Sequence, residues 1–225
     1  MWCVPELNER YIANMEDVLA FYERPYNPKE PVVCLDEKPI TLHADVRPAI
    51  AAKPGREARR DSDYERRGTA NAFLAVEPKA GRHFCFPTWD RSGFQFARVV
   101  LELAMSYPKA TRIHLVMDNL NINCEKSLTA ALGSQIGSQI WRRFAIHHTP
   151  KHGSWFDQAE IEIGIFAKQC LGKRRIPDFR TLLRKFKDWS RRINQAATKI
   201  NRQFDRKDAT NTFGYDKNCF TRSTN

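Results

Sequence analysis

The chain has 225 residues, of which 42% are hydrophobic, so it is long enough to bury a core of its own. Its formal net charge of +11 and its isoelectric point near 9.6 predict a polyanionic partner, with nucleic acid as the first candidate. No apolar run approaches the roughly 20 residues of a membrane helix, and the first residues lack the regions of a signal peptide. We therefore expect a folded, cytoplasmic, nucleoid-associated protein with no membrane partner.

The six cysteines are scattered along the chain without a C-x-x-C pair. This spacing favours free thiols over a zinc ribbon or a dense disulfide framework. The thiols are those of Cys3, Cys34, Cys85, Cys124, Cys170 and Cys219.

The first third of the chain contains one predicted helix and one predicted strand. Apolar residues recur at helical spacing from Asn8 to Tyr22, and prolines then end the pattern. Residues 31–36 form an apolar run that ends in an acid, which predicts a buried strand with Asp36 at its end. Residues 37–67 carry Pro, Gly and many charges, so we expect a long irregular segment there.

The middle of the chain alternates between strands and helices. Residues 70–76 and 82–89 are apolar runs joined by a Pro- and Gly-containing turn, which predicts an antiparallel hairpin. A helical pattern opens at Ser92, and residues 113–117 form a second apolar strand that is followed by Asp118. The acid at the end of the first strand is thus repeated.

Three more elements precede the C-terminal region. We expect a short helix over residues 124–132, a strand over 144–147 and a helix over 157–171. The residues of this last helix that we expect to face inward are Ile161, Ile165 and Phe166. From Pro177 the chain reads as one long basic helix.

This order of elements predicts an α/β fold with a mixed sheet, in which an antiparallel hairpin and parallel strands are flanked by helices. We divide the chain into an N-terminal helix and linker (residues 1–30), a catalytic domain (31–175) and a basic C-terminal helix and tail (176–225).

Asp36, Asp118 and Glu160 are candidate metal ligands. Phosphodiester chemistry with two metal ions needs several carboxylates at one point, and the ends of parallel strands meet at one edge of a sheet. Each acid also has a structural explanation, because an aspartate after a strand is commonly a turn residue. Glu160 fits a capping box that opens at Asp157.

Basic and aromatic residues are concentrated in the last third of the chain. Fourteen Lys or Arg against three Asp lie between Lys168 and Lys207. Such a surface suits phosphate contacts, and a solvated helix face is the alternative. His147, His148 and His152 are expected to contact substrate rather than zinc. Trp155 is expected either to stack on a base or to pack beside a helix.

Three stretches resemble the insertion-sequence transposases related to the Tc/mariner group, whose catalytic domain carries an Asp, Asp, Glu triad. They are VVCLDEK (residues 32–38), LVMDNLN (115–121) and HTPKHGSWFDQAE (148–160), and the likeness extends over about residues 2–208. The resemblance implies a ribonuclease H-like fold, two Mg²⁺ or Mn²⁺ ions held by Asp36, Asp118 and Glu160, cleavage at transposon ends and strand transfer into target DNA. It implies double-stranded DNA as partner and a homo-oligomer on that DNA.

Further residues are assigned from the same motifs and from the basic region. The expected DNA contacts are His148, Lys151, His152, Lys173, Arg174, Arg175, Arg184 and Lys185. The expected supporting residues are Asn119, Asn121, Trp155 and Asp157.

The sequence departs from the family pattern in two places. Asp157 stands where relatives have Asn, as a helix cap or as another ligand. The chain also begins just before the catalytic portion, so we expect it to lack the helix-turn-helix modules of relatives. Two alternatives to a transposase therefore stay open: a DNA-binding remnant that does not transpose, and a ribonuclease H-type nuclease.

Overall fold

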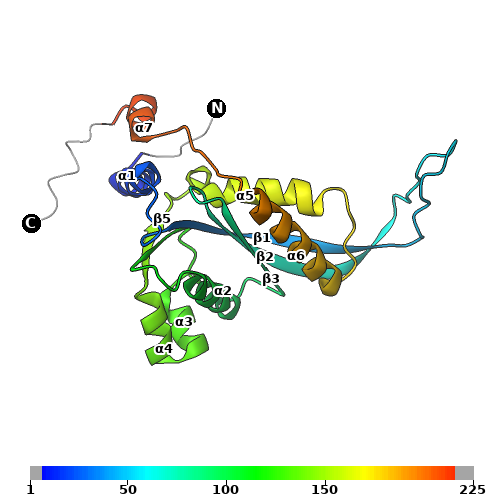
Figure 1. Cartoon of the computed structure of the whole chain (residues 1–225), viewed down its shortest axis with the longest axis horizontal. Coiled ribbons are helices and arrows are strands. Elements are labelled where there is room, and N and C mark those ends of the chain that lie inside the picture. Colours follow the sequence, from blue (N-terminus) through cyan, green and yellow to red (C-terminus); the bar gives the residue numbers. More distant parts are fainter. Residues whose placement is uncertain (1–6, 216–225) are drawn as a thin grey trace, which may run out of the picture.

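The centre of the molecule is a five-stranded mixed sheet with the strand order β3-β2-β1-β4-β5. The computed structural model describes residues 7–215 (Figure 1). Strands β1, β2 and β3 pair antiparallel, whereas β4 pairs parallel with both β1 and β5, so the predicted mixed α/β sheet is confirmed. The strands are β1 (Val32–Asp45), β2 (Tyr64–Glu77), β3 (Arg82–Thr88), β4 (Ile113–Met117) and β5 (Phe144–His148).

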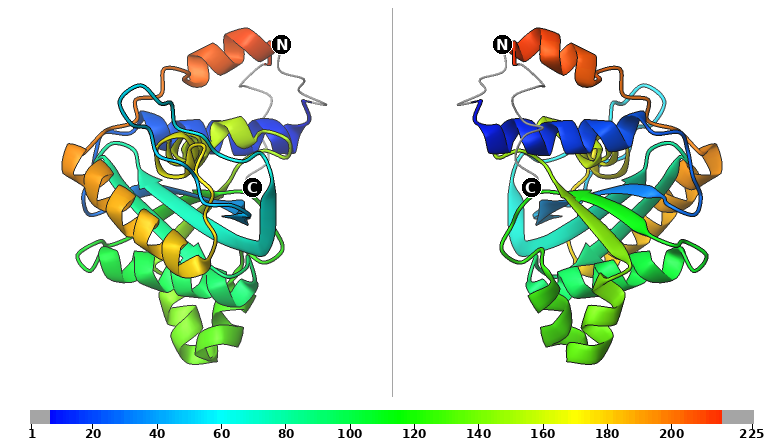
Figure 2. Two further views of the ribbon diagram at one scale, coloured as in Figure 1. Left: turned by 90° about the vertical axis from the view of Figure 1, so that its right-hand side faces the viewer. Right: turned by 90° about the vertical axis from the view of Figure 1, so that its left-hand side faces the viewer.

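Helices cover both faces of this sheet (Figure 2). One face carries α1 (Glu9–Glu23), α5 (Gln158–Phe166) and α6 (Phe179–Ala196), and a π-helical turn (Ala167–Leu171) continues α5. The other face carries α2 (Gly93–Ser106), with α3 (Glu125–Leu132) and α4 (Ser134–Trp141) beyond it. A 3₁₀ turn (Ser154–Phe156) precedes α5, and α7 (Arg206–Phe213) lies against α1.

Alternation along the strands explains why the sheet is covered twice. In β2, Phe73 and Ala75 point toward α2, while Leu74 points toward α5 and α6. All three side chains are fully buried, and each large apolar side chain buried in this way stabilises the fold by about 1.5–3 kcal/mol.

The segment between the first two strands is more regular than predicted. β1 runs on to Asp45 and β2 begins at Tyr64, because Ile40 and Leu42 alternate inward beneath α6. Only residues 46–63 leave the sheet. They form an arm that projects beyond the rest of the molecule (Figure 1), with isolated bridges between Ile50 and Arg59 and between Lys53 and Arg56.

Other sequence expectations need correction within the helices. Ile161 is exposed, and the buried residue beside it is Glu162, whose carboxylate lies 2.9 Å from Nδ1 of His83. Sequence periodicity missed α4, which follows α3 after Gly133 alone, and it missed α7. The apolar stripe of α6 packs on the sheet through four buried residues, Leu182, Phe186, Trp189 and Ile193, and the proposed boundary at residue 176 stays a prediction.

Four of the predicted free thiols lie in the described part of the chain, and those of Cys34, Cys85, Cys124 and Cys170 are unpaired. Cys3 and Cys219 lie outside the described residues, as do the N-terminal end of the predicted 1–30 unit and the tail after residue 215. None of the helices within residues 7–215 has the length and apolarity that a bilayer crossing requires.

Candidate active site

Asp36 and Asp118 lie at the same level of two neighbouring strands. The parallel pairing of β1 with β4 ends at Cys34 opposite Val116, and β4 itself ends at Met117. Asp118 therefore leaves the sheet where Asp36 lies, two residues past the last pair. Asp36 is inside β1 rather than at its end, which corrects the prediction, but the end of β4 opens the sheet beside it.

Glu160 is in the first turn of α5, and Asp157 caps that helix. Oδ1 of Asp157 accepts a hydrogen bond from the backbone N–H of Ala159 at 2.8 Å, while Oδ2 is buried without a partner among the described residues. The Glu160 side chain is exposed and makes no hydrogen bond within residues 7–215, so the reciprocal half of a capping box is missing. Its carboxylate is thus available for another role.

The acids of this region act on one another electrostatically. Burial raises the pKa of Asp36 to about 7, with further contributions from the charges of Asp118 and Glu160. Glu37, the next residue in β1, also has its pKa raised to about 7 by burial and by Asp118 and Asp36. The charges of neighbouring carboxylates therefore converge on Asp36.

Asp118 is held by hydrogen bonds as well as by burial. Burial raises its pKa, and the backbone N–H of Leu120 and the side-chain amide of Asn123 oppose that shift. Nδ2 of Asn123 donates to Oδ1 of Asp118 at 3.0 Å. The charge of Arg91 also favours the ionised forms of Asp118 and Glu37, which lowers the pKa of each.

The donor chemistry fits Mg²⁺ or Mn²⁺, because these ions prefer carboxylate oxygens and a cation relieves repulsion among neighbouring acids. In the described residues no three His, Cys, Asp or Glu side chains are drawn together into a ready-made metal centre. The assignment of Asp36, Asp118 and Glu160 as ligands therefore stays a prediction, supported by their mutual electrostatic influence.

A groove of about 730 Å³ opens beside Asp118. Asn119, Lys151 and His152, which the sequence motifs pointed to, all line it. His152 has a left-handed backbone with φ of 61°, which turns the loop before α5. The groove also receives three polar residues from the start of α1 that sequence reasoning missed, because nothing local links them to the acids: Asn8, Arg10 and Asn14.

The predicted basic contacts after α5 lie elsewhere. Nη1 of Arg175 donates to Oδ1 of Asp45 at 2.8 Å, and both terminal nitrogens donate to carbonyls of residues 61–63. Nη1 of Arg174 donates to the carbonyl of Cys170 at 2.7 Å, and Lys173 is exposed. Arg175 therefore fixes the base of the arm, which weakens the expectation that it contacts DNA.

The remaining assignments divide in the same way. Arg184 and Lys185 are on α6, away from the groove beside Asp118. His148 is half-buried next to that groove, and its charge lowers the pKa of Asp118. The Asn121 side chain is exposed, and its backbone carbonyl accepts a hydrogen bond from the thiol of Cys124.

Two aromatic expectations are resolved by packing. Trp155 stacks on Phe156 with ring centroids 3.8 Å apart and meets Phe204 edge-on, so it packs inside the protein. His147 is buried, with its Nδ1 2.6 Å from Asp17 and its Nε2 3.0 Å from Nδ1 of His114, so the expected substrate contact is wrong.

Comparison with solved structures supports the fold. The Mos1 strand transfer complex matches with a TM-score of 0.54 and 15% identity, covering 88% of this chain and 61% of that chain. The catalytic domain of Mos1 mariner transposase matches with a TM-score of 0.51 and 12% identity, covering 87% and 93%. The Mos1 mariner paired end complex with Mn matches with a TM-score of 0.51 and 15% identity, and this chain covers 62% of that chain. The predicted ribonuclease H-like fold is thereby confirmed.

Family comparison gives a more specific result. Among curated proteins none matches the chain. A family model described as DDE superfamily endonuclease matches residues 31–183, which is most of the chain and includes all three candidate acids. The chain therefore belongs to the DDE superfamily endonuclease family.

Proposed function

We propose that the chain is the catalytic portion of a DNA transposase, which cleaves transposon ends and joins them to target DNA. The observation that carries the proposal is the convergence of acids at one sheet edge, where the charges of Asp118 and Glu160 act on the half-buried Asp36. The groove beside Asp118 gives a DNA strand a path to these acids. The double-stranded DNA partner and the homo-oligomer expected from the family likeness belong to the same proposal.

The residues around the acids have separable roles. Asp36, Asp118 and Glu160 would hold two Mg²⁺ or Mn²⁺ ions, and when bound these ions activate water or a DNA 3′-hydroxyl and stabilise the leaving oxygen. Asn123 fixes the orientation of Asp118 through its 3.0 Å hydrogen bond. Lys151 and Arg10, which both line the groove, would meet phosphates of the bound strand.

A nicking assay tests this function. The substrate is a supercoiled plasmid that carries the inverted repeats flanking the coding region, incubated with Mg²⁺ or Mn²⁺. We expect metal-dependent nicking by the wild-type chain and none by Asp118→Asn or Glu160→Gln. Glu102→Gln, a matched change on the exposed side of α2, should nick normally. Full nicking by Asp118→Asn would refute the proposed site.

The same assay separates the two alternatives. A DNA-binding remnant would retain the plasmid in a mobility-shift gel without nicking it at any metal concentration. A ribonuclease H-type nuclease would cleave the RNA strand of an RNA:DNA hybrid in preference to duplex DNA. We expect cleavage of the duplex.

A further inference from the structure

A pair of stacked aromatic rings lies on the surface where β3 leaves the sheet and α6 begins. The ring centroids of Trp89 and Phe179 are 3.9 Å apart, with an interplanar angle of 20°. Trp89 follows β3, and Phe179 is the first residue of α6. The stack nevertheless leaves Trp89 61% exposed, so burial of apolar surface does not account for it.

This aromatic pair is close to the candidate active site. Arg91, two residues after Trp89, acts electrostatically on the carboxylates of Asp118 and Glu37, whose pKa values it lowers. The loop from β3 to α2 therefore connects the stacked rings to the acids.

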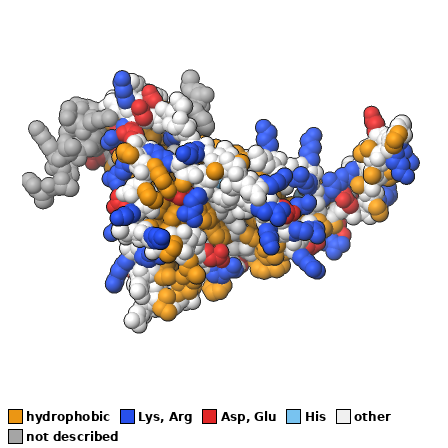
Figure 3. Space-filling model, in the orientation of Figure 1, with side chains coloured by type: hydrophobic (Ala, Val, Ile, Leu, Met, Phe, Trp, Pro, Cys, Tyr) orange, Lys and Arg blue, Asp and Glu red, His pale blue; other side chains and the backbone are white. Residues whose placement is uncertain are grey.

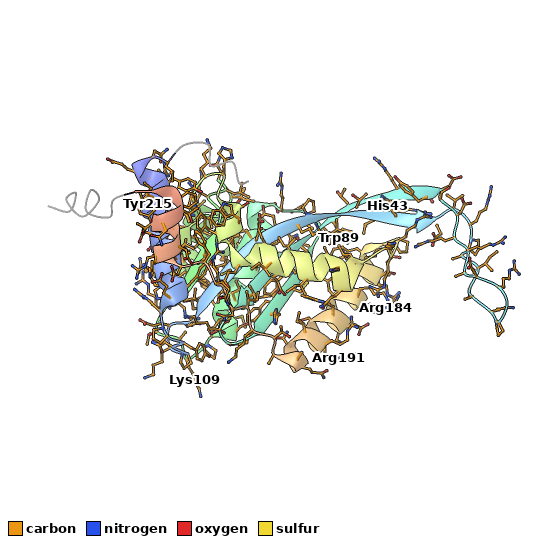
Figure 4. All side chains as sticks on the ribbon, turned by 90° about the horizontal axis from the view of Figure 1, so that it is seen from above. His43, Trp89, Lys109, Arg184, Arg191 and Tyr215 are labelled. Carbon is orange, nitrogen blue, oxygen red and sulfur yellow. The ribbon has the colours of Figure 1, made fainter. Side chains whose placement is uncertain are left out.

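A groove of about 670 Å³ continues from the rings along α6 and the edge strand β3. Leu183, one helical turn after Phe179, is 43% exposed and forms part of its wall. Three cations also line it: Arg184, Lys187 and Arg191. Arg191 pairs with Asp188 at 3.4 Å, whereas Arg184 and Lys187 form no ion pair within residues 7–215. Figure 4 shows Arg184 and Arg191 on α6, and Figure 3 shows how Lys and Arg side chains are spread over this face.

We infer that this surface, Trp89 and Phe179 with the basic groove of α6, binds unpaired DNA next to the acids. The inference rests on the proposed function. Open aromatic rings stack on any nucleobase, and cations in line with them meet the phosphates of the same strand. Duplex DNA keeps its base faces paired within its own stack, so only an unpaired or unstacked nucleotide can use the rings. The occupant is therefore a strand separated at or near the cleavage point.

Fluorescence anisotropy with a labelled single-stranded oligonucleotide tests the inference, with a duplex of the same sequence as comparison. The measurements are made in EDTA, so that binding is separated from cleavage. We expect Trp89→Leu to weaken single-strand binding about five- to a hundredfold, the range for removal of one base–aromatic stack, and to leave duplex binding unchanged. Trp89→Phe keeps a ring and should restore most of the affinity.

Two matched variants control for general effects. Tyr26→Leu removes an aromatic ring that is 52% exposed in the linker after α1, and it should leave single-strand binding unchanged. Lys109→Gln removes a cation that lies away from the Arg184 end of α6 (Figure 4) and should behave in the same way. By contrast, Arg184→Gln combined with Lys187→Gln should reduce the salt dependence of single-strand binding, by about 0.7 in the log–log slope for each phosphate that is no longer neutralised.

A 2-aminopurine base in the oligonucleotide reports stacking directly. We expect its fluorescence to be quenched by the wild-type chain and not by Trp89→Leu. Equal single-strand affinity and equal quenching for the two proteins would overturn the inference. So would an oligomer that dissociates in Trp89→Leu while single-strand binding is kept, because the face would then be an interface between copies.

The outcomes also separate this inference from the proposed function. Ring-dependent binding without any metal-dependent nicking would leave the strand-binding surface in place and remove the transposase. Nicking abolished by Asp118→Asn, together with strand binding that ignores Trp89, would do the reverse.

Discussion

At the scale of single residues, the acids of the site are held in a state that costs folding free energy when no cation is present. The folded pKa of Asp36, about 7, lies above the value of 3.8 for an exposed aspartate. The stability that protonated Asp36 contributes is therefore present at acidic pH and is lost as the pH rises through about 7.

Asp36→Asn imitates the protonated form and should remove this pH dependence. At about pH 8 without metal, we expect the variant to be more stable than the wild type by about 1–2 kcal/mol, less than the full shift implies because Asp36 is partly solvated. At about pH 4 the two should be equal. Urea unfolding at both pH values measures the difference. Saturating Mn²⁺ should stabilise only the wild type, and a pH-independent difference would contradict the argument.

Asp157 is a separate case, because its carboxylate both caps α5 and is buried close to the other acids, which raise its pKa together with that burial. Asn keeps the capping oxygen without the charge, whereas Ala removes both. We expect Asp157→Ala to cost about 0.5–2 kcal/mol of unfolding free energy and Asp157→Asn to cost little near neutral pH. Thermal unfolding of the two variants measures this, and equal destabilisation would show that the charge, not the cap, is what stabilises the loop.

At the scale of elements, the segment after α6 ties together parts that are far apart in sequence. Nη1 of Arg202 donates to the carbonyl of Trp155 at 3.0 Å, and the backbone N–H of Ile200 donates to the carbonyl of Pro78 at 3.0 Å. The Arg202 guanidinium also lies over the rings of Trp155 and Phe156. This segment, which lies beyond the region matched by the family model, thereby holds the loop that leads into α5 and Glu160.

Arg202→Ala should loosen that loop. Hydrogen bonds from a charged donor are worth about 1.5–3 kcal/mol, so we expect a decrease of this order in the free energy of unfolding. Hydrogen exchange should also quicken at the amides of Phe156 and Asp157, whose N–H groups bond within the 3₁₀ turn. Arg202→Lys, which keeps the charge but not the planar fork, should lie between the two. Unchanged exchange in Arg202→Ala would show that the loop is held by its own packing.

Sequence patterns foretold the elements of the site better than its depth. The position of Asp118 after β4 followed from an apolar run that ends in an acid. Asp36 was placed at a strand end because Glu37, Lys38 and Pro39 interrupt the apolar run, yet pairing with β2 carries β1 past them. Contacts between distant segments have no local signal, so Arg10 beside Asp118 and the stack of Trp89 on Phe179 appear only in three dimensions.

At the scale of the whole molecule, the projecting arm is the part whose removal should separate stability from DNA affinity. Its residues 46–63 are nearly all exposed, and the cores on both faces of the sheet lie elsewhere. Within residues 47–62 there are five Arg or Lys and two acids, a surplus of three positive charges. The arm therefore adds positive charge at the end of the molecule without adding core.

Replacing residues 47–62 by a short Gly-Asn turn should leave the melting temperature nearly unchanged, since β1 and β2 still pair through Ala44 and Glu65. Duplex affinity should fall, and the slope of log K against log salt should become shallower by about 0.9 for each phosphate that the arm no longer neutralises. A second variant that keeps the arm but changes Arg47, Arg56 and Arg59 to Gln controls for its shape. If only the deletion weakens binding, the arm acts through its length and not its charge. If both weaken it equally, the arm is an electrostatic extension of the DNA-binding surface.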